Sequence, residues 1–343
     1  MTIDKTAYKD VWILGEQDQD TIRDVSYELL KRGKDLADKR GVRLVALMLG
    51  SNLDEPTIQQ LIHYGADKVI AVMDPSLKHF TPDPYIRIIT SLIEKYKPEI
   101  LIASATTTGR TVAPAVAINC NAGLTADCTG LDIDDEDGSL IQTRPAIGGN
   151  ILATIKTPEH RPQMATVRPH SNQPMQPDRD RTGDIVFETV DNALVKSRIK
   201  QIDFRPMDEE GANIQDADVV VSGGKGCKKE ESFELIARLA ELLGGAVGAS
   251  REAVDLGWVS YPHQVGLSGK TVSPKLYLAF GISGAVQHLA GIKTAENIIA
   301  VNNDPESQIF NVADFSIQGD LFQILPMVIE KLENRKKARD SED

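Results

Sequence analysis

Short apolar runs alternate with amphipathic segments along the first hundred residues of the chain. The apolar runs have the length of buried strands and lie at 11–14, 42–49, 68–72 and 100–105. Between them, apolar residues recur at helical spacing in 21–39, 58–64 and 84–96. Strands that alternate with helices in this way form parallel sheets covered on both faces. The pattern therefore predicts an α/β fold with a doubly wound, mostly parallel sheet.

A different pattern begins near residue 124, where the apolar runs become shorter and turns separate them. We expect strands at 131–133, 140–143, 151–155 and 164–167, with a hairpin turn at Asp137-Gly138. Hairpins join antiparallel neighbours, so these strands are expected to extend the sheet in the antiparallel sense. The polar, proline-rich stretch 170–184 predicts a surface loop.

A second change of composition, at 201–211, separates these elements from a further α/β unit. In that unit we expect strands at 218–222, 275–280 and 297–301, and helices at 231–243 and 321–332. A chain of 343 residues is long enough for two domains. We therefore predict an N-terminal α/β domain at 1–206 and a C-terminal α/β domain at 207–343.

The charge of the chain argues against one broad class of partner. Asp and Glu outnumber Lys and Arg by 50 to 38, which gives a formal net charge of −12. Such an acidic chain offers no general basic field to a phosphate backbone, so we expect no nucleic-acid partner. The longest stretch without charged residues, 276–292, is too short and too polar for a membrane span, so we expect no membrane insertion.

The cysteines indicate the compartment. Cys120, Cys128 and Cys227 are widely spaced and form no C-x-x-C pair. Three thiolates cannot ligate an iron–sulfur cluster that needs four. An odd number of cysteines suits a reducing environment, and the N-terminal residues lack the apolar core of a signal peptide. We therefore predict a cytoplasmic protein.

Motifs for metal binding and nucleophilic catalysis are incomplete. The acidic run 132–137 resembles a calcium loop, but Asp137 stands at the position that requires glycine. The six histidines include no H-x-x-x-H pair for zinc. Ser283 and His288 lie five residues apart at an expected helix start and would not face each other as a hydrolytic pair. We predict no metal site and no catalytic acid, base or nucleophile.

Four glycine-rich segments stand close together in the second domain. They are SGGKG at 222–226, GASREAVDLG at 248–257, QVGLSGK at 264–270 and GISG at 281–284. Any one of them is explained by a turn between a strand and a helix. Such turns can also point backbone N–H groups at an anion. Four in one small domain therefore predict a site for a large phosphorylated ligand.

Longer segments around these motifs run almost without interruption from Val219 to Pro326: VSGGKG, GASREAVDLGW, HQVGLSGKTVSPKLYLAFGISGAVQHLAG and IIAVNNDPESQIFNVADFSIQGDLFQILP. Together they resemble the FAD domain of electron transfer flavoprotein α subunits. The first domain resembles the same family at LTADCTGL, TRPAIGGN and RPQMATVRPH. The resemblance therefore covers essentially the whole chain.

The resemblance implies one FAD in the C-terminal domain. It places Ser250 and Arg251 beside the flavin ring, Ser268 near its N5 or O4, and His288 near its O2. It assigns the adenosine end to Asn302. The cofactor-binding residues that it implies are Lys225, Ser250, Arg251, Gln264, Val265, Gly266, Leu267, Ser268, Ser283, Gly284, Ala285, Val286, Gln287, His288, Asn302, Asp320 and Leu321.

Two segments depart from the usual pattern of the family. Lys225 stands where an arginine is usual, so a contact to phosphate would lose the planar fork of a guanidinium. Leu267 and Ser268 stand where Gln-Thr is usual, so the loop keeps a hydroxyl but loses an amide donor. The second departure bears on the tuning of the flavin and not on its binding.

The resemblance also implies partners and a function. Such α subunits pair with a β subunit and pass single electrons to an acyl-CoA dehydrogenase or reductase. TRPAIGGN and RPQMATVRPH resemble the anaerobic type, some members of which bifurcate electrons from NADH. We expect the first domain to pack on the β subunit through an apolar face at the uncharged run 111–126. The alternatives are a housekeeping carrier that serves a quinone reductase, and a nucleotide-binding dehydrogenase module without flavin.

Overall fold

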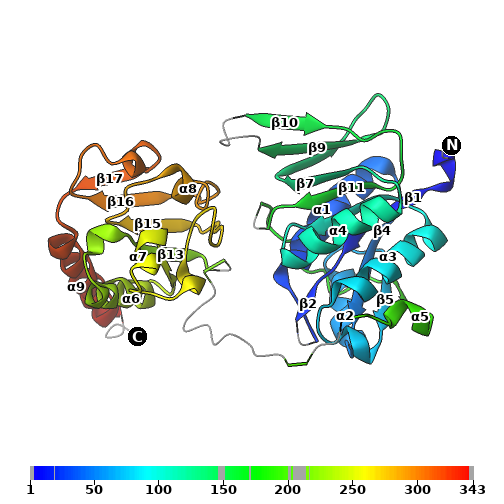
Figure 1. Ribbon diagram of the computed structural model, residues 1–343, viewed down its shortest axis with the longest axis horizontal. Coiled ribbons are helices and arrows are strands. Elements are labelled where there is room, and N and C mark those ends of the chain that lie inside the picture. The colour runs from blue at the N-terminus through cyan, green and yellow to red at the C-terminus, as the bar shows by residue number, and fades with distance from the viewer. Residues whose placement is uncertain are drawn as a thin grey trace. The chain divides into compact units, whose positions relative to one another are not determined.

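The computed structural model describes residues 4–18, 20–145, 151–169, 171–199, 202–203, 214–215 and 217–339. The chain divides into two units, Met1–Phe204 and Arg205–Asp343. The predicted domain boundary between 206 and 207 lies outside the described residues, as do residues 146–150 of the TRPAIGGN segment. Each unit has its own sheet and its own hydrophobic clusters, and each is described by itself (Figure 1).

A seven-stranded sheet forms the centre of the first unit, and all of its strand pairs are parallel. In spatial order the strands are β12 (Asp184–Phe187), β5 (Lys68–Met73), β4 (Leu44–Gly50), β1 (Lys9–Leu14), β6 (Pro98–Ser104), β11 (Gln163–Val167) and β7 (Leu124–Cys128). The helices are α1 (Asp24–Arg40), α2 (Glu55–His63), α3 (Pro82–Tyr96), α4 (Thr107–Asn119) and α5 (Asn192–Val195). The predicted α/β fold with a mostly parallel sheet is confirmed.

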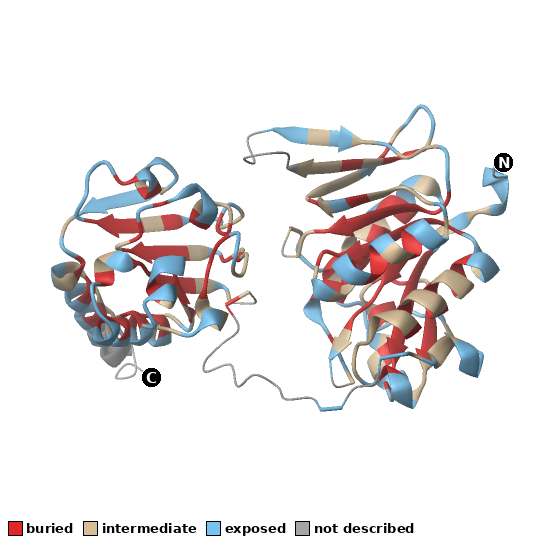
Figure 2. Ribbon diagram, in the orientation of Figure 1, coloured by how far each residue is buried: buried red, intermediate tan, exposed pale blue. Residues whose placement is uncertain are grey.

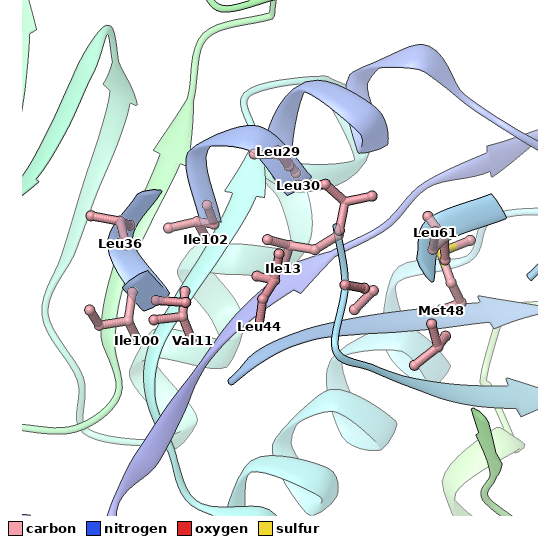
Figure 3. Packing of buried hydrophobic residues seen from close by; sticks show 14 of the residues in the cluster. Val11, Ile13, Leu29, Leu30, Leu36, Leu44, Met48, Leu61, Ile100 and Ile102 are labelled. Atoms are coloured by element: carbon pink, nitrogen blue, oxygen red, sulfur yellow. The ribbon is translucent and has the colours of Figure 1, made fainter. Parts of the chain in front are cut away.

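Both faces of the central strand β1 are buried, because helices cover the sheet on each side. Val11 and Ile13 belong to the cluster that includes Leu29 of α1 (Figure 3). Trp12 and Leu14 point to the opposite face and belong to the cluster under α3 and α4. Side chains alternate along a strand, so a strand with two covered faces has an uninterrupted apolar sequence.

The predicted antiparallel extension of the large sheet is wrong in part. β8 (Gly130–Ile133), β9 (Leu140–Pro145) and β10 (Leu152–Ile155) form a separate antiparallel sheet. β11 instead enters the large sheet between β6 and β7 and runs parallel to both. Every residue of β11 is buried, as is typical of a central parallel strand, whereas β10 alternates exposed and half-buried residues (Figure 2).

The uncharged run 111–126 does not form the exposed apolar face that we expected. Most of it belongs to α4, whose residues Val112 and Val116 are buried. These residues pack in the hydrophobic cluster of their own unit, beside residues of α3. Among the large apolar residues of the helix, Ile118 is exposed, with 78% of its surface accessible. Packing of a β subunit on this run stays a prediction.

The second unit is built on a five-stranded parallel sheet. In spatial order its strands are β14 (Ala246–Ala249), β13 (Val219–Gly223), β15 (Leu276–Phe280), β16 (Ile298–Asn302) and β17 (Phe315–Gln318). The helices are α6 (Phe233–Leu242), α7 (Arg251–Asp255), α8 (Val286–Leu289) and α9 (Leu321–Arg339). Residues of α6 and α9 pack with Val221 and Phe280 on one face, and Val220 and Tyr277 lie in the cluster on the other.

None of the described helices is long and apolar enough to cross a membrane. Within the part of the chain that the structure describes, no three His, Cys, Asp or Glu side chains are grouped so that they could hold a metal ion.

Candidate functional site

The strand order of the second unit marks one place in its sheet where a ligand is expected. From β13 the chain passes to β14 on one side, and it then returns to β15 on the other side of β13. The loops after β13 and β15 therefore lead to opposite sides of the sheet. In open parallel sheets, ligands bind outside the carboxyl ends of the strands at such a reversal.

Backbone hydrogen bonds join the carboxyl ends of all five strands into one continuous edge. They run from Ser250 N–H to the Gly223 carbonyl (3.0 Å), from Gly224 to Phe280 (2.9 Å), from Gly281 to Val301 (2.9 Å) and from Gly319 to Asn302 (3.0 Å). The glycine-rich segments predicted from the sequence follow or flank these strand ends. The fold therefore brings together segments that lie up to about one hundred residues apart in the chain.

The loop 264–270 is attached to this edge at both of its ends. Val265 N–H donates to the Ala249 carbonyl at the end of β14 (2.9 Å). Leu267 N–H donates to the Gln287 carbonyl in α8 (2.7 Å). Within the loop, the side-chain Nε2 of buried Gln264 donates to the hydroxyl oxygen of exposed Ser268 (3.1 Å).

Several polar atoms at this edge are buried without a hydrogen-bond partner among the described residues. They include the Ser222 and Ser250 hydroxyl oxygens and Nδ1 of His288. The other ring nitrogen of His288 lies 2.9 Å from the hydroxyl of Tyr277, which is fully buried. Buried polar groups are nearly always hydrogen-bonded, so the Ser250 hydroxyl and Nδ1 of His288 are candidates for contacts with a ligand.

Burial keeps the His288 imidazole neutral. Desolvation lowers the pKa of His288 to about 4, and it raises the pKa of Tyr277. The pair therefore meets as a neutral phenol and a neutral imidazole. Tyr277 was not among the residues predicted from the sequence. Its signal was present, because a tyrosine in a buried strand usually requires a partner for its hydroxyl.

Two exposed cations flank the edge, and each pairs with an acid of α7. Lys225 lies after β13, and its ammonium is 3.2 Å from Glu252. Arg251 is the first residue of α7, and its Nε is 3.2 Å from Asp255. The side chains of both cations are about two-thirds exposed. Both charges are therefore available to an anion, partly offset by their acidic neighbours.

Exposed apolar side chains lie on the loops and helices of the same edge. Leu256, Tyr261, Leu267 and Val286 each have more than half of their surface exposed. Leu267 and Val286 stand on the two segments joined by the Leu267–Gln287 hydrogen bond. Large exposed apolar residues near convergent polar groups are typical of a site for an aromatic ligand.

The remaining predicted residues hold the loops of the edge in place. Asn302 Nδ2 donates to the Ile282 carbonyl (2.9 Å) and to the Ser307 hydroxyl (3.0 Å). Asp320 accepts the Phe322 N–H at the start of α9 (3.0 Å), and Leu321 is buried in the core. In the described structure, the side chains of Asn302, Asp320 and Leu321 contact other parts of the protein.

Gly284 has a backbone conformation that few other residues adopt, with φ at +82°. A Cβ atom at this position would lie 2.2 Å from the backbone nitrogen of Ile309. The sequence suggested a glycine that lets a ligand approach. The structure shows that the protein's own 307–309 segment already makes this close approach, since Ile309 N–H donates to the Ser283 carbonyl (3.1 Å).

The first unit has a similar reversal of strand order, between β1 and β6, but its own side chains fill it. Glu16 follows β1 and is buried, and its carboxylate accepts the Thr106 hydroxyl (2.5 Å) and Arg23 (3.0 Å). Thr106 is the N-cap of α4. Burial raises the pKa of Glu16, which accords with its removal from water.

A cavity of about 950 Å³ opens at the amino ends of the strands of the first unit. Its lining includes ion pairs such as Arg40 with Glu99 and Arg43 with Asp10. Ligands of parallel sheets bind at the opposite, carboxyl end of the strands. The carboxyl edge of the second unit is therefore the better candidate for the functional site.

In a comparison with known proteins, each of the two units matches a family model. The family model described as the electron transfer flavoprotein domain matches residues 11–193. The family model described as the electron transfer flavoprotein FAD-binding domain matches residues 213–293. The second match contains the segments at the ends of β13, β14 and β15.

Three curated relatives match nearly the whole chain. The electron transfer flavoprotein subunit alpha of Thermoanaerobacterium thermosaccharolyticum is 45% identical and covers 96% of this chain and 99% of its own. The acryloyl-CoA reductase electron transfer subunit beta of Anaerotignum propionicum is 38% identical and covers 98% of each. Subunit LctC of the lactate dehydrogenase (NAD⁺, ferredoxin) of Acetobacterium woodii is 38% identical and covers 100% of this chain and 81% of its own.

Among solved structures, a thiamine diphosphate-dependent 4-hydroxybenzoylformate decarboxylase of Rhodococcus jostii aligns with 90% of this chain and 54% of its own. The identity is 11% and the TM-score 0.24, so the alignment carries no argument about the fold.

Proposed function

Because the chain belongs to the electron transfer flavoprotein α-subunit family, we propose that it binds one FAD in its second unit and passes single electrons within a heterodimer. The donor in this proposal is the flavin of a β subunit, and the acceptor is an acyl-CoA dehydrogenase or reductase.

The observation that carries the proposal is the chemistry of the carboxyl edge. The described edge combines exposed apolar side chains, two exposed cations and buried polar atoms without partners. FAD has a flat aromatic ring with polar edges, and a diphosphate. The apolar residues suit the ring, the orphaned atoms suit its polar edges, and a cation suits the diphosphate. The residues present therefore fit the cofactor.

The bound FAD would supply reversible one-electron chemistry, and the residues of this chain would bind and orient it. Ser250, Ser268 and His288 would direct hydrogen-bond donors at the ring. A Tyr277 hydroxyl that donates to Nε2 of His288 leaves the imidazole proton on Nδ1, the atom without a partner. Arg251 would stabilise negative charge on the reduced ring, and Lys225 would contact a phosphate.

Two of the relatives support the choice of electron-transfer partners. One is an electron transfer subunit of an acryloyl-CoA reductase, and another is a subunit of a lactate dehydrogenase that uses NAD⁺ and ferredoxin. Their names favour an acyl-CoA reductase or dehydrogenase as acceptor, and they make NADH-dependent electron bifurcation part of the proposal. A carrier that serves a quinone reductase is the second candidate within the same family.

Co-expression with the neighbouring β subunit tests the proposal. The purified heterodimer should show a flavin absorbance band. Acid treatment should release FAD from it, including the FAD bound by this chain. Ser250→Ala in this chain should lower FAD retention, because the ring loses one of its donors. A colourless protein with bound nicotinamide would instead support a dehydrogenase module. Rapid reduction by NADH would favour the bifurcating type over the housekeeping carrier.

A further inference from the structure

Gln264 and Ser268 form a side-chain hydrogen bond within the loop that closes the carboxyl edge. The Gln264 side chain is buried, with 4% of the residue exposed, whereas Ser268 is exposed. The distance from Gln264 Nε2 to Ser268 Oγ is 3.1 Å. The buried amide thus lies behind the hydroxyl, on the side away from solvent.

The backbone fixes both ends of this interaction. Gln264 N–H donates to the Tyr261 carbonyl (2.9 Å), and the Gln264 carbonyl accepts Lys270 N–H (2.7 Å). The Tyr261 hydroxyl donates to the carbonyl of Ser268 (3.0 Å). A Cβ atom at Gly269 would lie 2.4 Å from the Gln264 carbonyl oxygen, so the turn is closely packed. The amide therefore approaches the hydroxyl from a defined direction.

The chemistry of the two groups decides which one donates. An amide nitrogen carries two hydrogens and no available lone pair, so it acts as a donor. A serine hydroxyl has one proton and two lone pairs. Because the Ser268 oxygen accepts from Gln264, its proton is left for an acceptor on another side.

We propose that Gln264 is a positioning residue, which makes the Ser268 hydroxyl a hydrogen-bond donor to the flavin. This inference rests on the proposed function. Within the exposed part of the loop, Leu267 cannot donate from its side chain, so the Ser268 hydroxyl is the side-chain donor of the segment 265–268. The amide that the family usually carries at position 267 is absent, and a buried amide at 264 now controls the remaining hydroxyl.

A hydroxyl held as a donor affects electron transfer in a defined direction. Negative charge on the ring attracts a donor more strongly than the neutral ring does. The donor therefore favours addition of the first electron. Without Gln264, the hydroxyl would rotate among several acceptors and lose part of this preference.

A double-mutant cycle on the FAD-loaded heterodimer tests the inference. The variants are Gln264→Met, Ser268→Ala and the two combined, with Ser268→Thr as the control that keeps a hydroxyl. Spectroelectrochemical titration gives the potential of the first electron, and acid release gives the FAD content. Each single variant should lower the equilibrium constant for the first electron about tenfold, which is about 59 mV for a one-electron couple.

The combined variant should show no further shift, because Gln264 acts through the Ser268 hydroxyl. In a Ser268→Thr background, which keeps a hydroxyl, Gln264→Met should lower the potential as it does in the wild type. Equal shifts for Gln264→Met with and without the hydroxyl would overturn the positioning role, as would the absence of any shift in Gln264→Met. A wild-type heterodimer in which this chain holds no FAD would overturn the proposed function as well.

If Gln264→Met does not fold, Gln264→Glu replaces it. A carboxylate accepts the hydroxyl proton and turns it away from the flavin, so the potential should fall more in the presence of Ser268 than in the Ser268→Ala background. The shift in that background measures the added charge alone. Equal shifts in the two backgrounds would again overturn the proposal.

Discussion

Arg251 is the residue whose charge most directly concerns the proposed flavin, and the structure limits how strong its effect can be. The side chain is 70% exposed and pairs with Asp255. Exposed ion pairs and screened charges contribute about 0.2–1 kcal/mol. For a one-electron couple this range corresponds to about 10–40 mV. A buried, unpaired arginine would have had a larger effect.

We expect Arg251→Ala to lower the potential of the first electron by about 10–40 mV, because negative charge on the ring loses a positive neighbour. Spectroelectrochemical titration measures the shift. Arg251→Lys, which keeps the charge, should recover part of it. Asp255→Asn is the matched control: it frees the guanidinium from its acid and should raise the potential. Identical potentials in all four proteins would place Arg251 away from the flavin.

His288 makes the stability of the second unit depend on pH. Its pKa is lowered to about 4 in the folded protein, whereas an unfolded histidine titrates near 6.5. Between these values the unfolded chain binds a proton that the folded chain does not. Stability is therefore complete above pH 6.5 and falls as the pH is lowered towards 4, by about 1.4 kcal/mol per pH unit.

The FAD-free protein should accordingly lose roughly 3 kcal/mol in the free energy of unfolding of this unit between pH 7 and pH 4 through His288. His288→Gln should lack this part of the loss. Urea titrations can follow Trp258 in a Trp12→Phe background, because Trp258 lies in the second unit and Trp12 in the first. Equal pH dependence in the two proteins would show that His288 is not held neutral by burial.

At the level of residues, the sequence predicted where the site lies better than what each side chain does. Glycine-rich segments after predicted strands can be recognised directly in the amino-acid sequence, so the segments that form the site were predicted. Tyr277 was missed, because its contact with His288 depends on the packing of two elements. Gln264 was predicted to bind the cofactor, and its hydrogen bond to Ser268 could not be predicted from its residue type. The resemblance assigns Asn302 to the adenosine end of FAD. Its hydrogen bonds to the Ile282 carbonyl and the Ser307 hydroxyl could not be predicted from its residue type.

Among the elements, the separate antiparallel sheet of the first unit ends in a partly exposed edge strand. Its edge strand β10 begins with Leu152, which is 64% exposed, and Ile151 just before it is 65% exposed (Figure 2). An uncovered apolar edge strand invites pairing with another chain. This edge replaces α4 as the surface on which we expect the β subunit to pack.

Leu152→Asp should therefore weaken the heterodimer at least tenfold, because a charge would be buried at the contact. Size-exclusion chromatography at decreasing concentration measures dissociation. Ile118→Asp, at an exposed position of α4, is the matched control and should leave the heterodimer intact. Dissociation by the α4 variant, with the β10 variant unaffected, would restore the surface first expected from the sequence.

The elements that the sequence predicted well have long apolar runs or a clear helical period. In β4 and β5, residues on both faces of the strand are buried. In α3, apolar residues recur at helical spacing along a helix of 15 residues. β14 and β17 were missed, because AVGA and FSIQ are four residues long and carry little apolar pattern. The direction of β11 depends on which neighbours it meets, and no local pattern encodes that choice.

At the level of the whole molecule, each unit has one large parallel sheet with hydrophobic clusters on both of its faces, and these clusters lie within that unit. Unfolding of such a chain is not expected to be a single two-state event. A ligand that binds one unit should stabilise that unit alone. Binding raises the free energy of unfolding by about 2.7 kcal/mol when the free ligand is at one hundred times its dissociation constant.

Calorimetry of the FAD-free chain should therefore show two transitions, and added FAD should move one of them upwards. Trp258 fluorescence should follow the transition that moves, and Trp12 fluorescence the one that stays. A joint upward shift of both transitions would mean that the two units unfold as one cooperative body.

The buried carboxylate of Glu16 has a consequence for stoichiometry. The sheet of the first unit reverses its strand order as a nucleotide-binding sheet does, yet Glu16, Thr106 and Arg23 already satisfy one another at that point. An incoming phosphate would meet a negative charge in the place where it needs a donor. Of the two sheets with a reversal of strand order, the one in the second unit is therefore the candidate for nucleotide binding. If a heterodimer contains a second nucleotide, we expect the other subunit to bind it.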